Sequence, residues 1–303
     1  MKKFILVAGL FFSLLSFGQK IERITYLDST NNIVDSVKYA IKRVVYKLDN
    51  NKYLVEEFKF SNIKESAEEV LEIKNFSKDG ISTYYFDNGN IKSKYNYKEG
   101  VLNGFYEKFY ENGKIKETGF YLEKNIKKID NYWTVTGLQK VTKGNGTYSF
   151  EYSQEENNIV FSGQVIDGLY EGKWTTQKNI YPYWEETYEK GELMEGIYFE
   201  SKQIIKKYKS VFIMSEPPKG MYYFRQSIAQ KLSNESNIKG KVIIKFYINH
   251  EGKITNPIIS KNKDKYLKHL ITDLLSKERN WSVAYLRGKP YNCYFDLPLN
   301  FGN

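Results

Sequence analysis

Residue types that often cross-link or activate proteins are scarce in this sequence. Cys293 is its one cysteine, so no internal disulfide can form. With His250 and His269 as the two histidines, the chain also has too few thiols and imidazoles for a structural zinc site. Six prolines in 303 residues exclude a long proline-rich spacer. We therefore expect a fold held by ordinary packing, without a metal or cofactor.

The motifs of common active sites are missing as well. The sequence holds no G-x-S-x-G nucleophile elbow, no phosphate-binding P-loop and no H-E-x-x-H zinc motif. Cys293 falls in a strand-like stretch with no base beside it, which indicates a packing role. Glu185 and Glu186 follow Trp184, and an aromatic ring beside two acids can suit a carbohydrate, but such pairs are common among 36 acidic residues. We expect no enzymatic activity, and an unrecognised hydrolase is the alternative.

Aromatic residues, by contrast, are frequent. The chain carries 27 tyrosines and 19 phenylalanines, and both types favour half-buried β-sheet surfaces. Its length and its 41% hydrophobic residues suffice for more than one packed unit. The net charge of +10 permits contact with anionic surfaces, but lysines and glutamates are interleaved without a nucleic-acid-binding stripe. We expect a mainly β protein without a nucleic-acid partner.

The first 18 residues have the features of a secretory signal peptide. Two lysines precede an apolar run over residues 4–17, which as a helix would measure about 21 Å against a hydrocarbon core of about 30 Å. Ser16 and Gly18 supply the small side chains that signal peptidase requires, so cleavage is expected between Gly18 and Gln19. The chain should be periplasmic or otherwise exported, unless the leader is retained as an anchor.

A 24-residue period runs through the middle of the sequence. The Asn-Gly pair at 88–89 recurs at 112–113, 24 residues later (113 − 89), and a weaker copy follows at the same spacing. Asn-Gly between alternating aromatic and aliphatic residues is a strong hairpin signal, because a type I′ turn needs positive φ at both central positions. Each repeat should contain two short strands and two turns. The expected repeat-turn glycines are Gly89, Gly113, Gly137, Gly104, Gly172 and Gly196.

A glycine followed two residues later by an aromatic residue is the second repeated feature. It occurs at Gly104 and Tyr106, and its fullest form is Asp-Gly-Leu-Tyr-Glu-Gly-Lys-Trp over residues 167–174. These motifs resemble MORN repeats in the YwqK-like variant, clearest over residues 80–199, with residues 60–64 as a copy that lost its glycine. The resemblance implies an extended single-layer antiparallel sheet that contacts protein or lipid.

Further β-like stretches precede the repeats. Residues 37–48 and 53–60 are examples, whereas residues 65–73 suit either a short helix or a charged edge strand. We interpret residues 19–214 as one β-rich region. The Ser-Glu-Pro-Pro-Lys-Gly stretch at 215–220 is predicted to be a linker.

The remaining residues, 221–303, are expected to form a small α+β domain. Apolar residues recur at helical spacing over 222–232 and 266–277, and strand-like stretches cover 241–248, 253–260 and 291–301.

Five motifs of this segment are similar, in order and spacing, to the TonB C-terminal domain: Gly240-Lys241-Val242, Gly252-Lys253-Ile254, Trp281-Ser282-Val283-Ala284, Gly288-Lys289-Pro290 and Leu297-Pro298-Leu299-Asn300-Phe301. In that family the domain binds a short segment of an outer-membrane receptor as an added strand along its last β-strand. The resemblance implies a peptide-binding edge at Tyr291, Asn292, Cys293, Tyr294 and Phe295. The Pro-rich arm and permanent transmembrane helix of an energy transducer are not recognised here, which favours passive binding over force transduction.

Together these features predict an extended antiparallel β-hairpin repeat sheet followed by a small α+β domain. The function expected first is that of a non-catalytic periplasmic adaptor, whose C-terminal domain contacts a cell-envelope protein by strand addition, in the context of transmembrane transport. The alternative is a structural or surface-binding protein that contacts membrane lipid or cell wall through its basic, aromatic sheet.

Overall fold

The computed structural model describes residues 20–301, except for residues 30, 124–125, 155–156, 178–180, 236–237, 261–264 and 279. The expected signal peptide and its cleavage site at Gly18 and Gln19 lie outside these residues. Among the helices that are described, none is long and apolar enough to cross a membrane.

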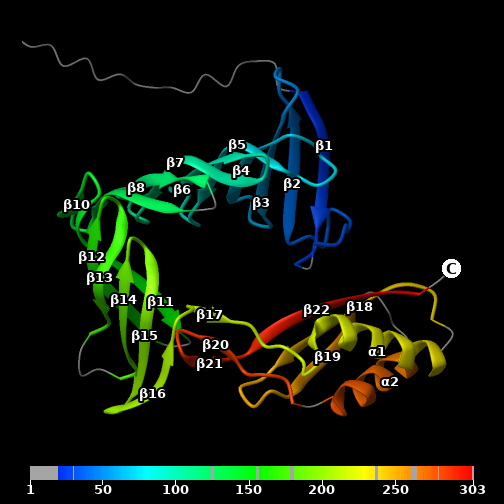
Figure 1. The fold of residues 1–303 in the computed structure, drawn as a ribbon. Helices are drawn as coiled ribbons and strands as arrows, with labels where there is room; N and C mark the ends of the chain where they lie inside the picture. The colour runs from blue at the N-terminus through cyan, green and yellow to red at the C-terminus, as the bar shows by residue number, and fades with distance from the viewer. Residues whose placement is uncertain are drawn as a thin grey trace, which may run out of the picture. The chain divides into compact units, whose positions relative to one another are not determined.

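The described chain is mainly β, as predicted, and sixteen strands form one sheet in which neighbours follow chain order (Figure 1). These strands are β1 Lys20–Leu27, β2 Ile41–Lys47, β3 Tyr53–Lys59, β4 Lys64–Val70, β5 Lys78–Tyr85, β6 Ile91–Lys98, β7 Val101–Phe109, β8 Ile115–Tyr121, β9 Lys127–Trp133, β10 Gln139–Thr142, β11 Asn145–Gln154, β12 Asn157–Ile166, β13 Leu169–Thr175, β14 Tyr183–Glu189, β15 Glu192–Glu200 and β16 Gln203–Tyr208. The registers from β1 to β11 and from β13 to β16 are all antiparallel. The expected long antiparallel sheet is confirmed.

The segment for which the sequence left helix or edge strand open is an interior strand. Strand β4 pairs with β3 on one side and with β5 on the other. Ser66 and Val70 are buried on this strand, and the residues between them are half-buried, because both faces of an interior strand pack against neighbouring side chains.

The Asn-Gly hairpins do not have the predicted type I′ turn. In the first, the amide of Gly89 donates to the Phe86 carbonyl at 2.9 Å and the amide of Phe86 donates to the Asn90 carbonyl at 2.8 Å. Gly89 has a φ of 85°, and Asn88 is not in the positive-φ region. This is a three-residue loop with a single left-handed position, which glycine fills. Asn62, with a φ of 58°, takes that position in the copy that lost its glycine.

Type I′ geometry occurs at the opposite ends of the strands. Glu99 and Gly100 have φ values of 50° and 84°, and Asp167 and Gly168 have values of 51° and 82°. The hairpin signal was therefore correct, but the turn type was assigned to the wrong end of the repeat.

Three of the six expected turn glycines are not at turns. Gly89, Gly113 and Gly137 lie in the hairpin loops, whereas Gly104, Gly172 and Gly196 lie inside β7, β13 and β15. Gly196 shows why a strand can require glycine, because a Cβ atom there would lie 2.1 Å from the Tyr208 ring.

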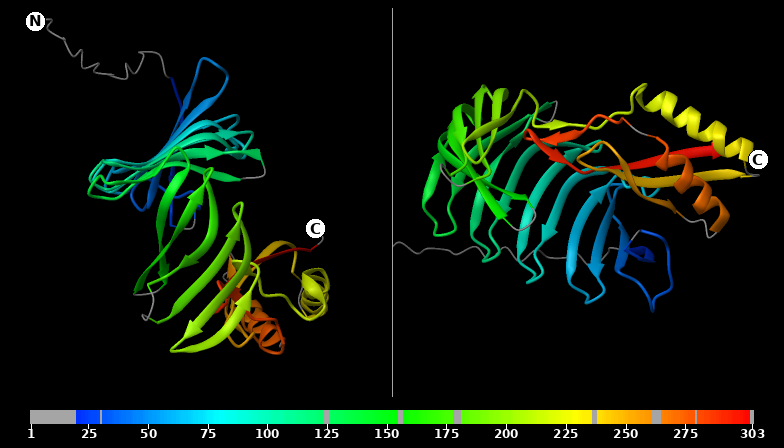
Figure 2. Two further views of the ribbon diagram at one scale, coloured as in Figure 1. Left: turned by 60° about the vertical axis from the view of Figure 1, so that its left-hand side comes forward. Right: turned by 90° about the horizontal axis from the view of Figure 1, so that it is seen from below.

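The described residues form two compact units, of which the first comprises those up to Gly146 together with Val165–Leu169. Figure 2 shows its strands following one another in chain order. Tyrosines line one face of this unit: the rings of Tyr95 and Tyr106 are 6.1 Å apart, and Tyr121 lies 5.1 Å from Tyr106. A separate apolar cluster contains Val45, Val55 and Val70.

The second unit comprises Thr147–Gln164 and Tyr170–Asn303, and thus the last repeat strands together with the C-terminal part. The elements that follow β16 are β17 Phe212–Ile213, α1 Gly220–Glu235, β18 Gly240–Ile248, β19 Ile254–Ser260, α2 Lys265–Ser276, β20 Ala284–Leu286, β21 Lys289–Tyr291 and β22 Cys293–Phe301. Buried side chains of both helices, of β18 and of β22 share one apolar core. The segment predicted as a linker is held in this part, since Ser215 Oγ donates to the Ser282 carbonyl at 2.5 Å and Ser282 N donates to the Glu216 carbonyl at 2.8 Å.

The predicted last strand over 291–301 is two strands in two sheets. β21 pairs with β20 in the small sheet β17-β20-β21, with Tyr291 opposite Ala284. β22 pairs with β18 in the sheet β19-β18-β22, with Cys293 opposite Ile248. The chain changes partner at Asn292, which lies between the strands.

Candidate functional site

Strand β22 forms an edge of the sheet β19-β18-β22 (Figure 1). Its register with β18 is continuous over nine residues, and no other described strand pairs with it. Of the five expected edge residues, Cys293, Tyr294 and Phe295 lie in β22, Tyr291 ends β21 and Asn292 lies between. Such an edge presents main-chain groups that an extended segment can satisfy.

Pro298 reveals which main-chain groups of β22 face outward. Its carbonyl accepts hydrogen bonds from Arg225 Nε at 2.9 Å and Nη2 at 2.6 Å, so this carbonyl points away from β18. Successive residues of a strand direct their amide and carbonyl groups to opposite sides. Tyr294 and Asp296, at even spacing from Pro298 without a bulge, therefore face outward too. A partner strand can bond to these two residues, whereas Pro298 has no N–H and its carbonyl is occupied.

Successive side chains of β22 point alternately into the apolar core and to the opposite face of the sheet. Cys293 and Phe295 are buried in the core, whereas Tyr294 and Asp296 are exposed on the opposite face. The Tyr294 ring lies 5.2 Å from that of Tyr247, and its hydroxyl donates to Asp296 Oδ1 at 2.6 Å. Partial desolvation raises the pKa of Tyr294, and its hydrogen bond to Asp296 adds to this. An aromatic pair and a carboxylate thus stand along the open edge.

The opposite edge of this sheet is less regular. Within β19, Asn256 has a φ of 50° and Pro257 follows it, and the register with β18 shifts between Lys245 and Tyr247. Bulges and prolines weaken an edge as a pairing site. β22 is therefore the better site for an added strand.

Glu185 and Glu186 do not form a paired acidic site. They are consecutive residues of β14 and so point to opposite faces of the sheet. Glu186 is 1% exposed and bonds to Arg287, whereas Glu185 bonds to Lys173 at 2.8 Å on the other face. The arrangement beside Trp184 therefore does not provide two convergent carboxylates.

The first unit contains a second buried glutamate. Glu117 is fully buried, and its Oε1 accepts a hydrogen bond from the Tyr106 hydroxyl at 2.6 Å. Lys127 Nζ lies 2.6 Å and Lys108 Nζ 3.6 Å from the same oxygen. Burial alone would raise the pKa of Glu117, but the two lysines and the hydrogen bonds outweigh it and hold this pKa at about 2.

Lysines lie over aromatic rings along the same unit. Lys92 Nζ is 5.8 Å from the centre of the Phe86 ring, and Lys116 Nζ is 5.2 Å from that of Tyr110. The two pairs repeat the 24-residue period. They combine cations with apolar rings at an accessible surface.

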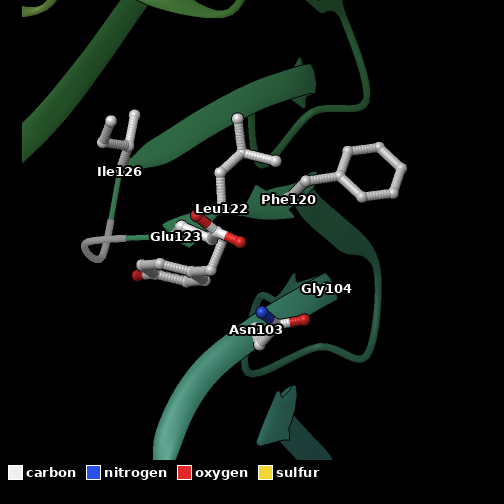
Figure 3. A pocket seen from close by; sticks show the side chains of 7 residues that line it. Asn103, Gly104, Phe120, Leu122, Glu123 and Ile126 are labelled. Atoms are coloured by element: carbon white, nitrogen blue, oxygen red, sulfur yellow. The ribbon is translucent and has the colours of Figure 1, made fainter. Parts of the chain in front are cut away.

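Exposed apolar side chains accompany these lysines. The rings of Phe105 and Phe120 are 5.4 Å apart and are 39% and 43% exposed. Phe120 also borders a shallow depression that Leu122, Glu123 and Ile126 line on the β8–β9 connection (Figure 3). Glu123 supplies the one carboxylate among the described residues that line it.

The one cysteine and the two histidines lie on three different elements. Cys293 is buried at the start of β22, His250 lies in the β18–β19 turn, and His269 lies on α2. In the part of the chain that the structure describes, no three His, Cys, Asp or Glu side chains are grouped to hold a metal ion. The sequence analysis did not identify a role for Arg225, Pro298 or Arg287. For Pro298, the signal in the sequence was a proline inside an alternating strand.

Comparisons with protein-family models, with curated proteins and with solved structures found no match to this chain.

Proposed function

We propose that this chain is a non-catalytic binding protein of the cell envelope, which captures an extended segment of a partner protein along β22. The observation that carries the proposal is the outward direction of Tyr294 and Asp296 on an unpaired edge that ends at Pro298. The resemblance to the TonB C-terminal domain supports binding by strand addition, and the expected leader supports a location in the cell envelope. Binding and location together make an adaptor role in the envelope the proposed function.

The chemistry of the edge defines a preferred partner. A residue placed beside Tyr294 would meet exposed aromatic surface, and a residue two positions further would meet the half-exposed carboxylate of Asp296. Cross-strand neighbours favour apolar or aromatic groups in the first position and a lysine or arginine in the second. The partner is therefore an extended segment with an apolar and a basic residue two positions apart.

The test is a proline substitution that removes one outward N–H. We expect Tyr294→Pro to fold, because its lost donor faces solvent as at Pro298, and to lose envelope partners in a crosslinked pull-down. Tyr294→Ala keeps the amide, so it should retain more partner than Tyr294→Pro. Equal capture by wild type and Tyr294→Pro would contradict strand addition. Truncation after Glu216 is a poorer test, because it also removes Arg287 from its contact with Glu186.

A second candidate is contact with an anionic surface, lipid or cell wall, through the first unit. The repeated lysine–aromatic pairs and the exposed Phe105 and Phe120 favour it, since they combine cations with apolar groups. This function does not require β22.

A further inference from the structure

The β20–β21 hairpin ends in an arginine that is almost fully buried. Arg287 and Gly288 form its tip with φ values of 50° and 77°, which is type I′ geometry. Arg287 is 8% exposed although it stands at a hairpin tip. A non-glycine residue held at positive φ and buried as a cation requires specific compensating contacts.

The guanidinium of Arg287 lies against the last repeat strands. Its Nη1 donates to Glu186 Oε2 on β14. The Arg287 Cζ atom lies 4.5 Å from the centre of the Phe161 ring and 5.3 Å from the centre of the Phe150 ring. A planar cation thus has a carboxylate at its edge and aromatic rings beside it, which is the environment that suits arginine.

The partners of Arg287 are themselves fixed. Tyr208 and Tyr188 hydroxyls donate to Glu186 at 2.6 and 2.8 Å. Burial raises the pKa of both phenols, and the charge of Glu186 adds to this, so they remain donors at neutral pH. Trp184 Nε1 donates to the Arg287 carbonyl at 2.7 Å, so the main chain of the tip is bound as well.

Gly288 shows how closely the tip fits. A Cβ atom there would lie 2.8 Å from the Tyr208 ring and 3.1 Å from Tyr198 Cβ. The aromatic surface therefore accepts an Arg-Gly tip and has no space for a larger second residue.

We propose that β14–β16, with Phe150 and Phe161 beside them, form an arginine-binding socket whose ligand is the Arg287 hairpin tip of the same chain. The socket binds the C-terminal residues to the last repeat strands. This is a role that the repeat motif itself does not specify. The inference stands whether or not β22 binds a peptide.

The test is chemical rescue in the full chain. We expect Arg287→Ala to lower the melting temperature, and millimolar methylguanidinium to restore part of the loss by entering the vacated site. Methylammonium, which has the charge without the planar fork, should restore less. In Arg287→Ala combined with Glu186→Gln the rescue should disappear. Equal effects of both cations, or rescue that persists without Glu186, would overturn the proposal.

A second variant keeps the test valid if Arg287→Ala does not fold. Gly288→Ala should displace the tip and speed hydrogen exchange of the Trp184 indole N–H. Gly89→Ala is the matched control, because it has a similar positive φ of 85° but nothing within 4 Å of the added Cβ. Unchanged exchange at Trp184 in Gly288→Ala would contradict the socket.

Discussion

Glu117 has three neighbours, Tyr106, Lys108 and Lys127, that share one of its carboxylate oxygens. Removing a charged member of such a buried group leaves the others without compensation. Burial lowers the pKa of Lys127 to about 8 although Glu117 opposes this, and Lys127 is still mainly protonated at pH 7. At the scale of single residues, the tyrosine-lined face is therefore stabilised by polar contacts as well as by ring packing.

The pH dependence of stability should report on Glu117. Its pKa is about 2 in the folded chain against an ordinary value of 4.5, so its contribution is complete above pH 4.5 and is lost as the pH falls toward 2. We expect Glu117→Gln to be less stable than wild type at pH 7, by on the order of 2–3 kcal/mol. Urea unfolding should show this difference shrinking between pH 5 and pH 2. A difference that stays constant over that range would contradict the assignment.

At the scale of elements, hairpin geometry follows from a small number of backbone positions. The Asn-Gly loops contain one left-handed residue, and the returning type I′ turns contain two. Asn62 fills the left-handed position where glycine is missing, which is reasonable because asparagine tolerates positive φ better than other side chains.

A pair of substitutions tests the single left-handed position. Gly113 has a φ of 79°, and within 4 Å an added Cβ would meet only the side chain of Asn90. We expect Gly113→Val to lower the free energy of unfolding by roughly 1–3 kcal/mol, because a β-branched residue tolerates this conformation poorly. Gly113→Asn should cost clearly less, as the native Asn62 indicates. Equal losses in thermal unfolding would mean that backbone conformation is not the cause.

At the scale of the whole molecule, two recognition surfaces are proposed, the β22 edge and the lysine-bearing first unit. They differ in their response to salt, because β22 would bind chiefly by main-chain pairing, which is not screened, whereas contact between lysines and anionic groups is screened. Each surface can be altered by substitutions in the full chain, so the contact between Arg287 and Glu186 is kept.

Sedimentation with vesicles tests the second surface. We expect the mature chain to bind anionic vesicles at low salt and to dissociate as salt is raised, with Lys92→Glu combined with Lys116→Glu weakening binding several-fold. Tyr294→Pro should bind as wild type does, which separates the two surfaces. Absence of sedimentation with anionic vesicles at low salt would remove lipid as the surface that this unit contacts.

Local sequence patterns were enough to predict much of the fold. The 24-residue period, the alternation of β-like stretches and the helical spacing over 266–277 depend on neighbouring residues, and α2 indeed buries Leu267, Ile271, Leu274 and Leu275. The glycine of each Asn-Gly loop was also visible. These features follow from backbone conformation and from the periodicity of helices and strands.

The sequence by itself thus determined most of the strands, both C-terminal helices and the Asn-Gly hairpin loops, and from it we predict a binding edge in the last strand. Only the tertiary structure decided that Arg225 covers Pro298, that Asn292 separates two sheets, and that Glu186 turns away from Glu185 toward Arg287. The physical reason is distance along the chain: Glu186 and Arg287 are 101 residues apart, and no local periodicity records which remote side chain will neutralise a buried charge.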